Sequence, residues 1–409
     1  MQHIKHYSLG LLVVFALLLG ALISAQSALA MTGEGTSANP YEIATADDLI
    51  EFAEKVNGGI AGIGGDPDAC AVLTDDIDLE GSEDNQWLSI GLDGSRKNYI
   101  GTFDGQGFII SGLYINTTSN TRGLFGYVGE GGTVANLIVK GTVVSSGSAG
   151  YGDGGIVGDN AGTVSNCVSD VAVKSGYNVG GVVGWNRDTG IITNCTNNGT
   201  ITGTSNDVFV GGVVGTNCGT VQNCTNNGTV ETATYAGGVV GVNFGTVSGS
   251  YNTKNVAGVT AGGVVGANSY ANVSGKVTSC YNTGTVSGTT AGGVIGTNYW
   301  HDDYYTTPGN VNSCYNTGKV TAPSEGATIG GVVGANSNGS TSGTVNGCYF
   351  LVGTAASGVG DNSDTITNVA SKTETQFNSG EVAWLLQDAV EQDGSTTTQV
   401  WGQEIGANN

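Results

Sequence analysis

Gly180-Gly181-Val182-Val183-Gly184-Trp185-Asn186 is one copy of a phrase that the chain repeats, Gly-Gly-(Val/Ile)-(Val/Ile)-Gly-x-Asn. The steps between successive copies are 26, 31, 26, 25, 30 and 38 residues, so a unit of 25 residues is lengthened by insertions. Periods of this size are typical of solenoids and propellers. The copies begin at Gly154, Gly180, Gly211, Gly237, Gly262, Gly292 and Gly330.

Two further phrases follow each copy, Gly-Thr-Val-x-x-Cys-(Tyr/Thr)-Asn and (Thr/Asn)-Gly-Thr-(Val/Ile). Three short extended stretches separated by Gly or Asn turns are therefore predicted for each unit. Leucine-rich repeats need leucines, and a propeller blade needs about 40–45 residues. The pattern predicts an all-β fold, a right-handed parallel β-helix, whose handedness is taken from the preference for right-handed parallel crossovers.

In a parallel β-helix, equivalent residues of successive coils stack about 4.8 Å apart. Val and Ile rows are expected to fill the interior. A row of asparagines is expected at a corner, where the side-chain amides bond one another and Asn accepts a left-handed backbone. This row is Asn197, Asn226, Asn252, Asn282 and Asn316.

The chain ends differ from the repeats. Residues 1–30 are interpreted as a signal peptide cleaved after Ala30, which implies a secreted or cell-surface protein without a membrane span after cleavage. Residues 31–120 are expected to form an N-terminal cap and irregular first coils, with a helix capped by Thr45. Residues 121–352 hold the repeats, and residues 353–409 are expected to form a C-terminal cap and tail with helical spacing from Thr375 to Gln387.

The formal net charge is −22, which makes nucleic acid a poor candidate partner. The acidic residues concentrate before position 105, whereas the repeats are nearly uncharged. Asp75-Asp76-Ile77-Asp78 lacks the spacing of an EF-hand loop and is expected to be a strand with exposed carboxylates. No catalytic residues, cofactor or metal site are assigned.

Six cysteines occupy one position of the unit, and Ser250 replaces Cys in another copy. Stacked free thiols are expected, because Cys behaves as a small buried hydrophobe. Some disulfides, such as Cys218 with Cys224, are the alternative, since secreted proteins often contain them. The six are Cys167, Cys195, Cys224, Cys280, Cys314 and Cys348.

Extra length falls mainly between the Gly-Gly phrase and the Cys phrase, as in 269–276, 299–310 and 337–342, with a second insertion point at 203–208 and 322–328. Binding concentrates on such loop edges. A ligand-binding segment rich in aromatic side chains is therefore predicted there. It comprises Tyr299, Trp300, His301, Asp302, Asp303, Tyr304 and Tyr305. The alternative is a loop whose rings pack over the neighbouring coil.

These phrases resemble the GLUG-motif repeat proteins of bacteria. Gly123-Leu124-Phe125-Gly126 matches the motif, and the later copies have Val or Ile in place of Leu. The resemblance implies an adhesin-type exoprotein, or the repeat region of a larger immunoglobulin A peptidase. It also implies a non-catalytic scaffold that binds a host or microbial glycan or surface protein. A polysaccharide lyase or hydrolase on the same fold, and a passive repeat segment of a larger protein, remain alternatives.

Overall fold

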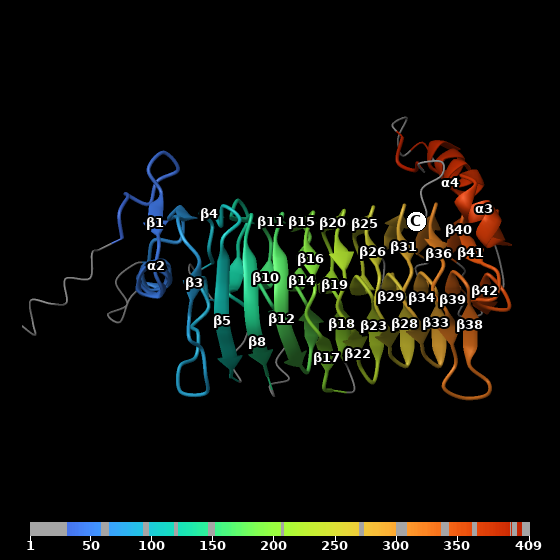
Figure 1. The fold of residues 1–409 in the computed structure, drawn as a ribbon, viewed down its shortest axis with the longest axis horizontal. Coiled ribbons are helices and arrows are strands. Elements are labelled where there is room, and N and C mark those ends of the chain that lie inside the picture. The colour runs from blue at the N-terminus through green and yellow to red at the C-terminus, as the bar shows by residue number, and fades with distance from the viewer. Residues whose placement is uncertain are drawn as a thin grey trace, which may run out of the picture.

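The computed structural model describes residues 31–58, 65–92, 98–117, 122–145, 152–205, 208–269, 274–299, 309–336, 343–361, 366–392, 394 and 399–402. In these residues the chain winds into a parallel β-solenoid of four sheets, here named A to D (Figure 1). Every pairing between named strands is parallel, and equivalent residues of successive copies pair, as Val240 does with Val265. The predicted all-β parallel β-helix is confirmed; its handedness stays a prediction.

Sheet A holds the Gly-Thr-Val strands and extends to the N-terminal end of the solenoid. Its strands are β1 (Tyr41–Ile43), β2 (Ala71–Leu73), β4 (Thr102–Asp104), β7 (Thr133–Ala135), β11 (Thr163–Ser165), β15 (Ile191–Thr193), β20 (Thr220–Gln222), β25 (Thr246–Ser248), β30 (Lys276–Thr278), β35 (Asn310–Asn312), β40 (Thr344–Asn346) and β43 (Ile366–Thr367).

Sheet B follows the Cys position. Its strands are β3 (Ile77–Asp78), β5 (Ile109–Asn116), β8 (Ile138–Val144), β12 (Val168–Ser175), β16 (Thr196–Asn197), β17 (Ile201–Gly203), β21 (Thr225–Asn226), β22 (Val230–Glu231), β26 (Tyr251–Asn252), β27 (Val256–Ala257), β31 (Tyr281–Asn282), β32 (Val286–Ser287), β36 (Tyr315–Asn316), β37 (Val320–Thr321), β41 (Tyr349–Leu351) and β44 (Ala370–Lys372). The single strand β12 is replaced in later coils by two short strands around an asparagine turn.

Sheets D and C meet at the Gly-Gly phrase. Sheet D contains β9 (Gly152–Gly154), β13 (Asn178–Gly180), β18 (Phe209–Gly211), β23 (Tyr235–Gly237), β28 (Thr260–Gly262), β33 (Thr290–Gly292) and β38 (Thr328–Gly330). Sheet C contains β6 (Phe125–Val128), β10 (Val157–Asn160), β14 (Val183–Asn186), β19 (Val214–Asn217), β24 (Val240–Asn243), β29 (Val265–Asn268), β34 (Ile295–Thr297), β39 (Val333–Ala335) and β42 (Val359–Asp361).

The prediction of three extended stretches per unit was wrong, because the Gly-Gly phrase is a corner and not one strand. In the coil of Gly237, strand β23 ends at that glycine and β24 begins at Val240. A Cβ on Gly238 would lie 2.6 Å from Cγ of Asn252, on the other side of the coil. Glycine is therefore required here for close packing, and its backbone φ is not in the left-handed region.

The interior is filled by stacked apolar rows, as predicted. Val239, Val240 and Val247 of one coil are all fully buried, and their equivalents in neighbouring coils are buried as well. The left-handed backbone positions differ from the expectation. They fall on the residue before each Cys, such as Asn194 and Ser279, and not on the asparagine row.

Helix α2 (Ala46–Asn57) packs beside the first coils (Figure 1). Thr45 caps the helix as predicted and forms a capping box with Asp48, and Leu49 and Phe52 are fully buried. Near the other end, α3 (Glu374–Asn378) and α4 (Glu381–Gln392) cover the side of the last coils. The Cβ of Ala389 on α4 lies 2.2 Å from where a Cβ on Gly347 would be, so this contact requires glycine.

Candidate functional site: the loop edge

The insertions predicted from the sequence lie at one corner of the solenoid, between sheets C and A. The insertion between Ser269 and Lys276 connects β29 to β30, the one after Tyr299 connects β34 to β35, and the one at 337–342 connects β39 to β40. We call this corner the loop edge. The second insertion point lies elsewhere, between sheets B and D, as at 322–328.

A row of buried asparagines holds the base of the loop edge. Each Nδ2 donates to the Oδ1 of the next asparagine at 2.8 Å. We call this row the loop-edge ladder; it is the Asn that closes each Gly-Gly phrase, and the sequence analysis did not single it out. Its members are Asn160, Asn186, Asn217, Asn243, Asn268, Asn298 and Asn336, all fully buried.

The second Nδ2 hydrogen of each rung closes the loop that follows. Asn243 donates to the carbonyl of Gly245, two residues along the chain, at 3.1 Å. Asn298 donates to the carbonyl of Gly309, eleven residues along, at 3.0 Å. The same bond therefore closes a tight turn in one coil and a long insertion in another, and the coil beneath keeps its register.

The predicted binding segment starts on this ladder. Tyr299 directly follows Asn298 and is half-buried, and burial raises the pKa of its phenol. Trp300, His301, Asp302, Asp303, Tyr304 and Tyr305 lie outside the described residues. The structure thus places the base of this segment at the loop edge, and ligand binding by the segment stays a prediction.

The asparagine row expected from the sequence forms a second ladder, the tight-turn ladder, in sheet B. Its rungs are joined by Nδ2 to Oδ1 bonds of 2.7–2.8 Å. Each Nδ2 also donates to the carbonyl two residues ahead, as Asn282 does to Gly284 at 2.8 Å. The prediction that these amides bond their neighbours is confirmed. The rungs are Asn197, Asn226, Asn252, Asn282 and Asn316.

The cysteine row is fully buried, and all eight cysteines of the chain are free. The thiol of Cys280 donates to the carbonyl of Thr278 at 3.2 Å, and Ser250 makes the same bond to Ser248 at 2.9 Å. Burial and the neighbouring thiols raise the pKa of Cys314 well above its usual range. These thiols are structural, and the alternative disulfide between Cys218 and Cys224 is not formed.

Two charged clusters were missed by the sequence analysis. Nη1 of Arg122 donates to both carboxylate oxygens of Asp153, at 2.7 and 2.8 Å, and Ser175 also donates to this carboxylate. All three are buried, and burial raises the pKa of Asp153. The sequence contains one signal for this cluster: Asp153 occupies the position at which the next coil has Val179.

The second cluster joins β10 to the end of β14 and the residue that follows it. Arg187 Nε donates to Asp159 at 2.7 Å, and its guanidinium lies 3.7 Å from the ring centroid of Trp185. Asp159 is fully buried. Both clusters consist of mutually paired charges. Within the described part of the chain, no three His, Cys, Asp or Glu side chains gather in a way that could hold a metal ion.

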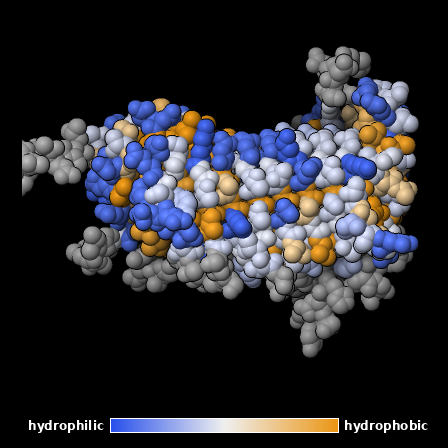
Figure 2. All heavy atoms as spheres, turned by 60° about the horizontal axis from the view of Figure 1, so that its bottom comes forward, coloured by the Kyte–Doolittle hydropathy of each residue, from blue (hydrophilic) through white to orange (hydrophobic). Residues whose placement is uncertain are grey.

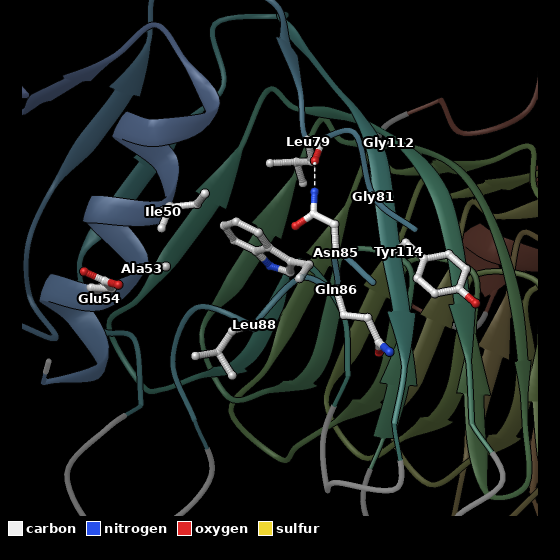
Figure 3. Close-up of a pocket in the computed structure, with 11 residues that line it drawn as sticks. Ile50, Ala53, Glu54, Leu79, Gly81, Asn85, Gln86, Leu88, Gly112 and Tyr114 are labelled. Atoms are coloured by element: carbon white, nitrogen blue, oxygen red, sulfur yellow. Dashed lines mark hydrogen bonds between the residues drawn. The ribbon is translucent and has the colours of Figure 1, made fainter. Parts of the chain in front are cut away.

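A small hollow of about 190 Å³ is lined by residues of α2 and of the first coils. Ile50 of α2 lines one side, and Trp87 and Leu88 are among the other lining residues. Nδ2 of Asn85 donates to the Leu79 carbonyl at 3.0 Å (Figure 3). Leu88 is 59% exposed. The carboxylates of Asp75, Asp76 and Asp78 are exposed, as expected. Asp76 has a structural contact, because its carboxylate accepts a hydrogen bond from the Ile109 amide at 2.8 Å.

Much of the repeat surface in this view has intermediate hydropathy (white), whereas hydrophilic residues gather around the N-terminal end (Figure 2). This matches the concentration of acidic residues before position 105. None of the described helices is long and apolar enough to cross a membrane.

Comparison with known families supports the resemblance seen in the sequence. Residues 175–202 match the model of the GLUG motif. A provisionally named Gly-rich membrane protein of Evansella cellulosilytica is 31% identical over 171 residues, covering 40% of this chain and 18% of that protein. Halomucin of Haloquadratum walsbyi is 29% identical over 172 residues, covering 40% of this chain and 2% of halomucin. The chain thus spans less than a fifth of these relatives.

Among solved structures, a provisionally assigned immunoglobulin A1 protease from Bacteroides ovatus aligns with 86% of this chain and 89% of its own, at 18% identity and a TM-score of 0.44. An IgA1 protease aligns with 83% of this chain and 24% of its own, at 15% identity and a TM-score of 0.44. The fold assignment rests on the strand pairing described above.

Proposed function

Because the chain carries GLUG repeats wound into a parallel β-solenoid, we propose that it is a secreted or surface-exposed bacterial scaffold without catalytic activity. Its coils form a rigid rod, and its loop edge presents variable segments to a glycan or protein. The segment from Tyr299 to Tyr305 is the proposed contact region, since it combines four aromatic rings with an imidazole.

The loop-edge ladder is the observation that carries this proposal. Asparagine rungs close loops that span 2, 4, 7 and 11 residues between donor and acceptor, and the Nδ2 to Oδ1 bonds between rungs stay at 2.8 Å. A frame that stays constant beneath loops of variable length is suited to presenting binding segments. The charged side chains of the two clusters, Arg122 with Asp153 and Arg187 with Asp159, pair with one another, which supports a role without catalysis.

A binding experiment tests the loop edge. The purified mature chain is applied to arrays of glycans and of host-matrix proteins, next to a variant in which 300–308 is replaced by a Gly/Ser segment of equal length. We expect the replacement to abolish the strongest signal. A matched replacement of 270–273, in the loop of a neighbouring coil, serves as the control and is expected to retain that signal.

Unchanged binding after replacement of 300–308 would contradict the local site. New reducing ends or unsaturated products after incubation with neutral and acidic polysaccharides would contradict the scaffold itself and favour a lyase or hydrolase.

A passive repeat segment of a larger protein is the second candidate. It is favoured by the small share of each relative that this chain covers, 18% and 2%. If this candidate is correct, we expect no saturable binding to any array ligand. We also expect the purified chain to be folded on its own, with a cooperative thermal unfolding transition.

A further inference from the structure

A groove of about 550 Å³ lies on sheet B, between two coils and the C-terminal segment. The coils contribute Tyr281 and Tyr315, with Thr283 and Thr317 beside them. On the opposite side, Phe377 and Trp401 come from α3 and from the chain after α4. The loop edge lies at the corner between sheets C and A, so this groove is a separate site.

Stacked tyrosines form one wall of the groove. The rings of Tyr251 and Tyr281 are 4.5 Å apart and inclined by 5°, and those of Tyr281 and Tyr315 are 4.9 Å apart and inclined by 1°. Parallel pairing of β26, β31 and β36 sets this arrangement, since it places equivalent residues one above the other.

The aromatic rings of the C-terminal segment pack against this row and are tilted relative to it. The Trp401 ring is inclined by 59° to both Tyr281 and Tyr315, at centroid distances of 6.4 and 5.5 Å. Hydrogen bonds fix Trp401, because its Nε1 donates to Ser313 Oγ at 2.8 Å and its amide donates to Gln387 Oε1 at 3.0 Å. The aromatic walls are thus fixed without a ligand.

The lining is uncharged, although the whole chain has a net charge of −22. Its polar groups are hydroxyls and the amide of Asn378. The phenol of Tyr281 is neutral at physiological pH and can donate a hydrogen bond, and burial raises its pKa further, to about 12. Such a lining offers no partner for a charged ligand, and it offers both aromatic surface and hydroxyl donors to a neutral polyol.

We propose that this groove binds one or two rings of a neutral saccharide. The apolar C–H face of a sugar ring would lie against Trp401 and Phe377, while sugar hydroxyls would bond the threonine and tyrosine hydroxyls. The volume lies within the range of about 300–1,000 Å³ that is typical of small-molecule sites. The proposal does not depend on the function proposed for the loop edge.

Isothermal titration of the purified chain with cellobiose, maltotriose and N,N′-diacetylchitobiose tests the proposal, with digalacturonate as the charged counterpart. We expect saturable binding of at least one neutral saccharide with a Kd below about 10 mM, and at least tenfold weaker binding of digalacturonate. Trp401→Ala is expected to weaken binding by about tenfold or more. Thr317→Val, which removes one hydroxyl, gives a milder loss.

Trp384→Ala is the matched control, because Trp384 is 66% exposed on α4 and does not line the groove. It is expected to bind like the parent chain. Circular dichroism and thermal unfolding confirm that each variant is folded. The variant with 300–308 replaced is expected to retain this binding, which separates the groove from the loop edge.

Absence of saturable binding for all three neutral saccharides overturns the proposal. Binding that persists unchanged in a folded Trp401→Ala or Phe377→Ala variant overturns it as well, as does equal or tighter binding of digalacturonate.

Discussion

The two asparagine ladders make the same hydrogen bonds, yet only one of them carries long insertions. In the loop-edge ladder the bond from rung to loop spans 2 to 11 residues. In the tight-turn ladder it always spans two, as in Asn226 to Gly228 and Asn252 to Lys254. Side-chain chemistry alone therefore does not decide where a β-solenoid accepts extra length.

The surroundings of the two ladders explain the difference. In five of the seven Gly-Gly phrases the second glycine packs across the coil against a tight-turn rung, and a Cβ on Gly263 would lie 2.4 Å from Cγ of Asn282. The tight turn is held in a space that only glycine leaves open. At the loop edge the corresponding bond spans two residues at Asn243 and seven at Asn268, so the length between donor and acceptor varies.

The largest expected effect is the introduction of a carboxylate into either ladder. Asn243→Asp in the loop-edge ladder and Asn252→Asp in the tight-turn ladder each replace an amide donor by a buried charge that faces another oxygen. We expect each variant to lose about 3–5 kcal/mol of the free energy of unfolding at pH 7, measured by denaturant titration.

Burial raises the pKa of such a carboxyl, so it is neutral in the folded chain at a pH where it ionises in the unfolded chain. The loss is therefore expected to shrink as the pH falls toward about 4. Costs that differ between the two variants by more than about 1 kcal/mol would contradict the equivalence of the two ladders.

Insertion of Gly-Ser-Gly-Ser-Gly compares the tolerance of the loop edge with that of the tight turn in the same coil. Placed after Phe244, it lengthens the loop edge and is expected to cost about 1–2 kcal/mol, chiefly the entropy of loop closure. Placed after Thr253, it also breaks the bond from Asn252 to the Lys254 carbonyl, at 2.7 Å. This variant is expected to lose about 2–3 kcal/mol more.

Urea unfolding of both insertion variants provides the measurement, and their equal stability would show that the glycine contact does not restrict the tight turn.

A smaller effect is expected in the cysteine row, which lies between the two ladders in each coil. Cys280→Ser is expected to cost about 1 kcal/mol, because Ser250 already makes the same bond to a carbonyl two residues before it. Ser250→Cys is the reverse substitution and is expected to be neutral or slightly stabilising. A loss above about 3 kcal/mol for Cys280→Ser would indicate a role beyond packing.

The smallest expected effect concerns the tyrosines that precede the tight-turn rungs. Burial raises the pKa of Tyr281 to about 12, above the usual value of a phenol, so the unfolded chain ionises first as the pH rises. The stability that Tyr281 contributes is complete below pH 10 and falls between about pH 10 and 12. In Tyr281→Phe this alkaline loss is expected to be smaller, by absorbance titration and thermal unfolding.

Much of this fold could be predicted because stacked residues repeat in the sequence. The buried Val rows, the free thiols and the bonded row that includes Asn282 all follow from one aligned position per coil. The loop-edge ladder was missed because Asn243 and its equivalents close a glycine phrase that was interpreted as one strand. The left-handed corner residue was misplaced by three positions, from Asn197 to Asn194.

The groove could not be predicted from periodicity. It joins Tyr281 to Trp401 across 120 residues, and its second wall comes from a segment that does not repeat. The pair of Arg122 and Asp153 also lies outside the repeat pattern, since Asp153 stands where other coils have a hydrophobic residue. Only tertiary contacts reveal such sites.

Both ladders are directional. In each of them the amide N–H points toward the next coil and the C=O toward the previous one, as from Asn217 to Asn243 and from Asn226 to Asn252. Backbone bonds alternate in direction, as Thr163 to Gly132 and Asn136 to Ser165 show, and so largely cancel. The side-chain dipoles add along the axis, as peptide dipoles do in a helix. The rod is therefore electrically polar, with its positive pole at the C-terminal coils, and two such rods lying side by side favour opposite orientations.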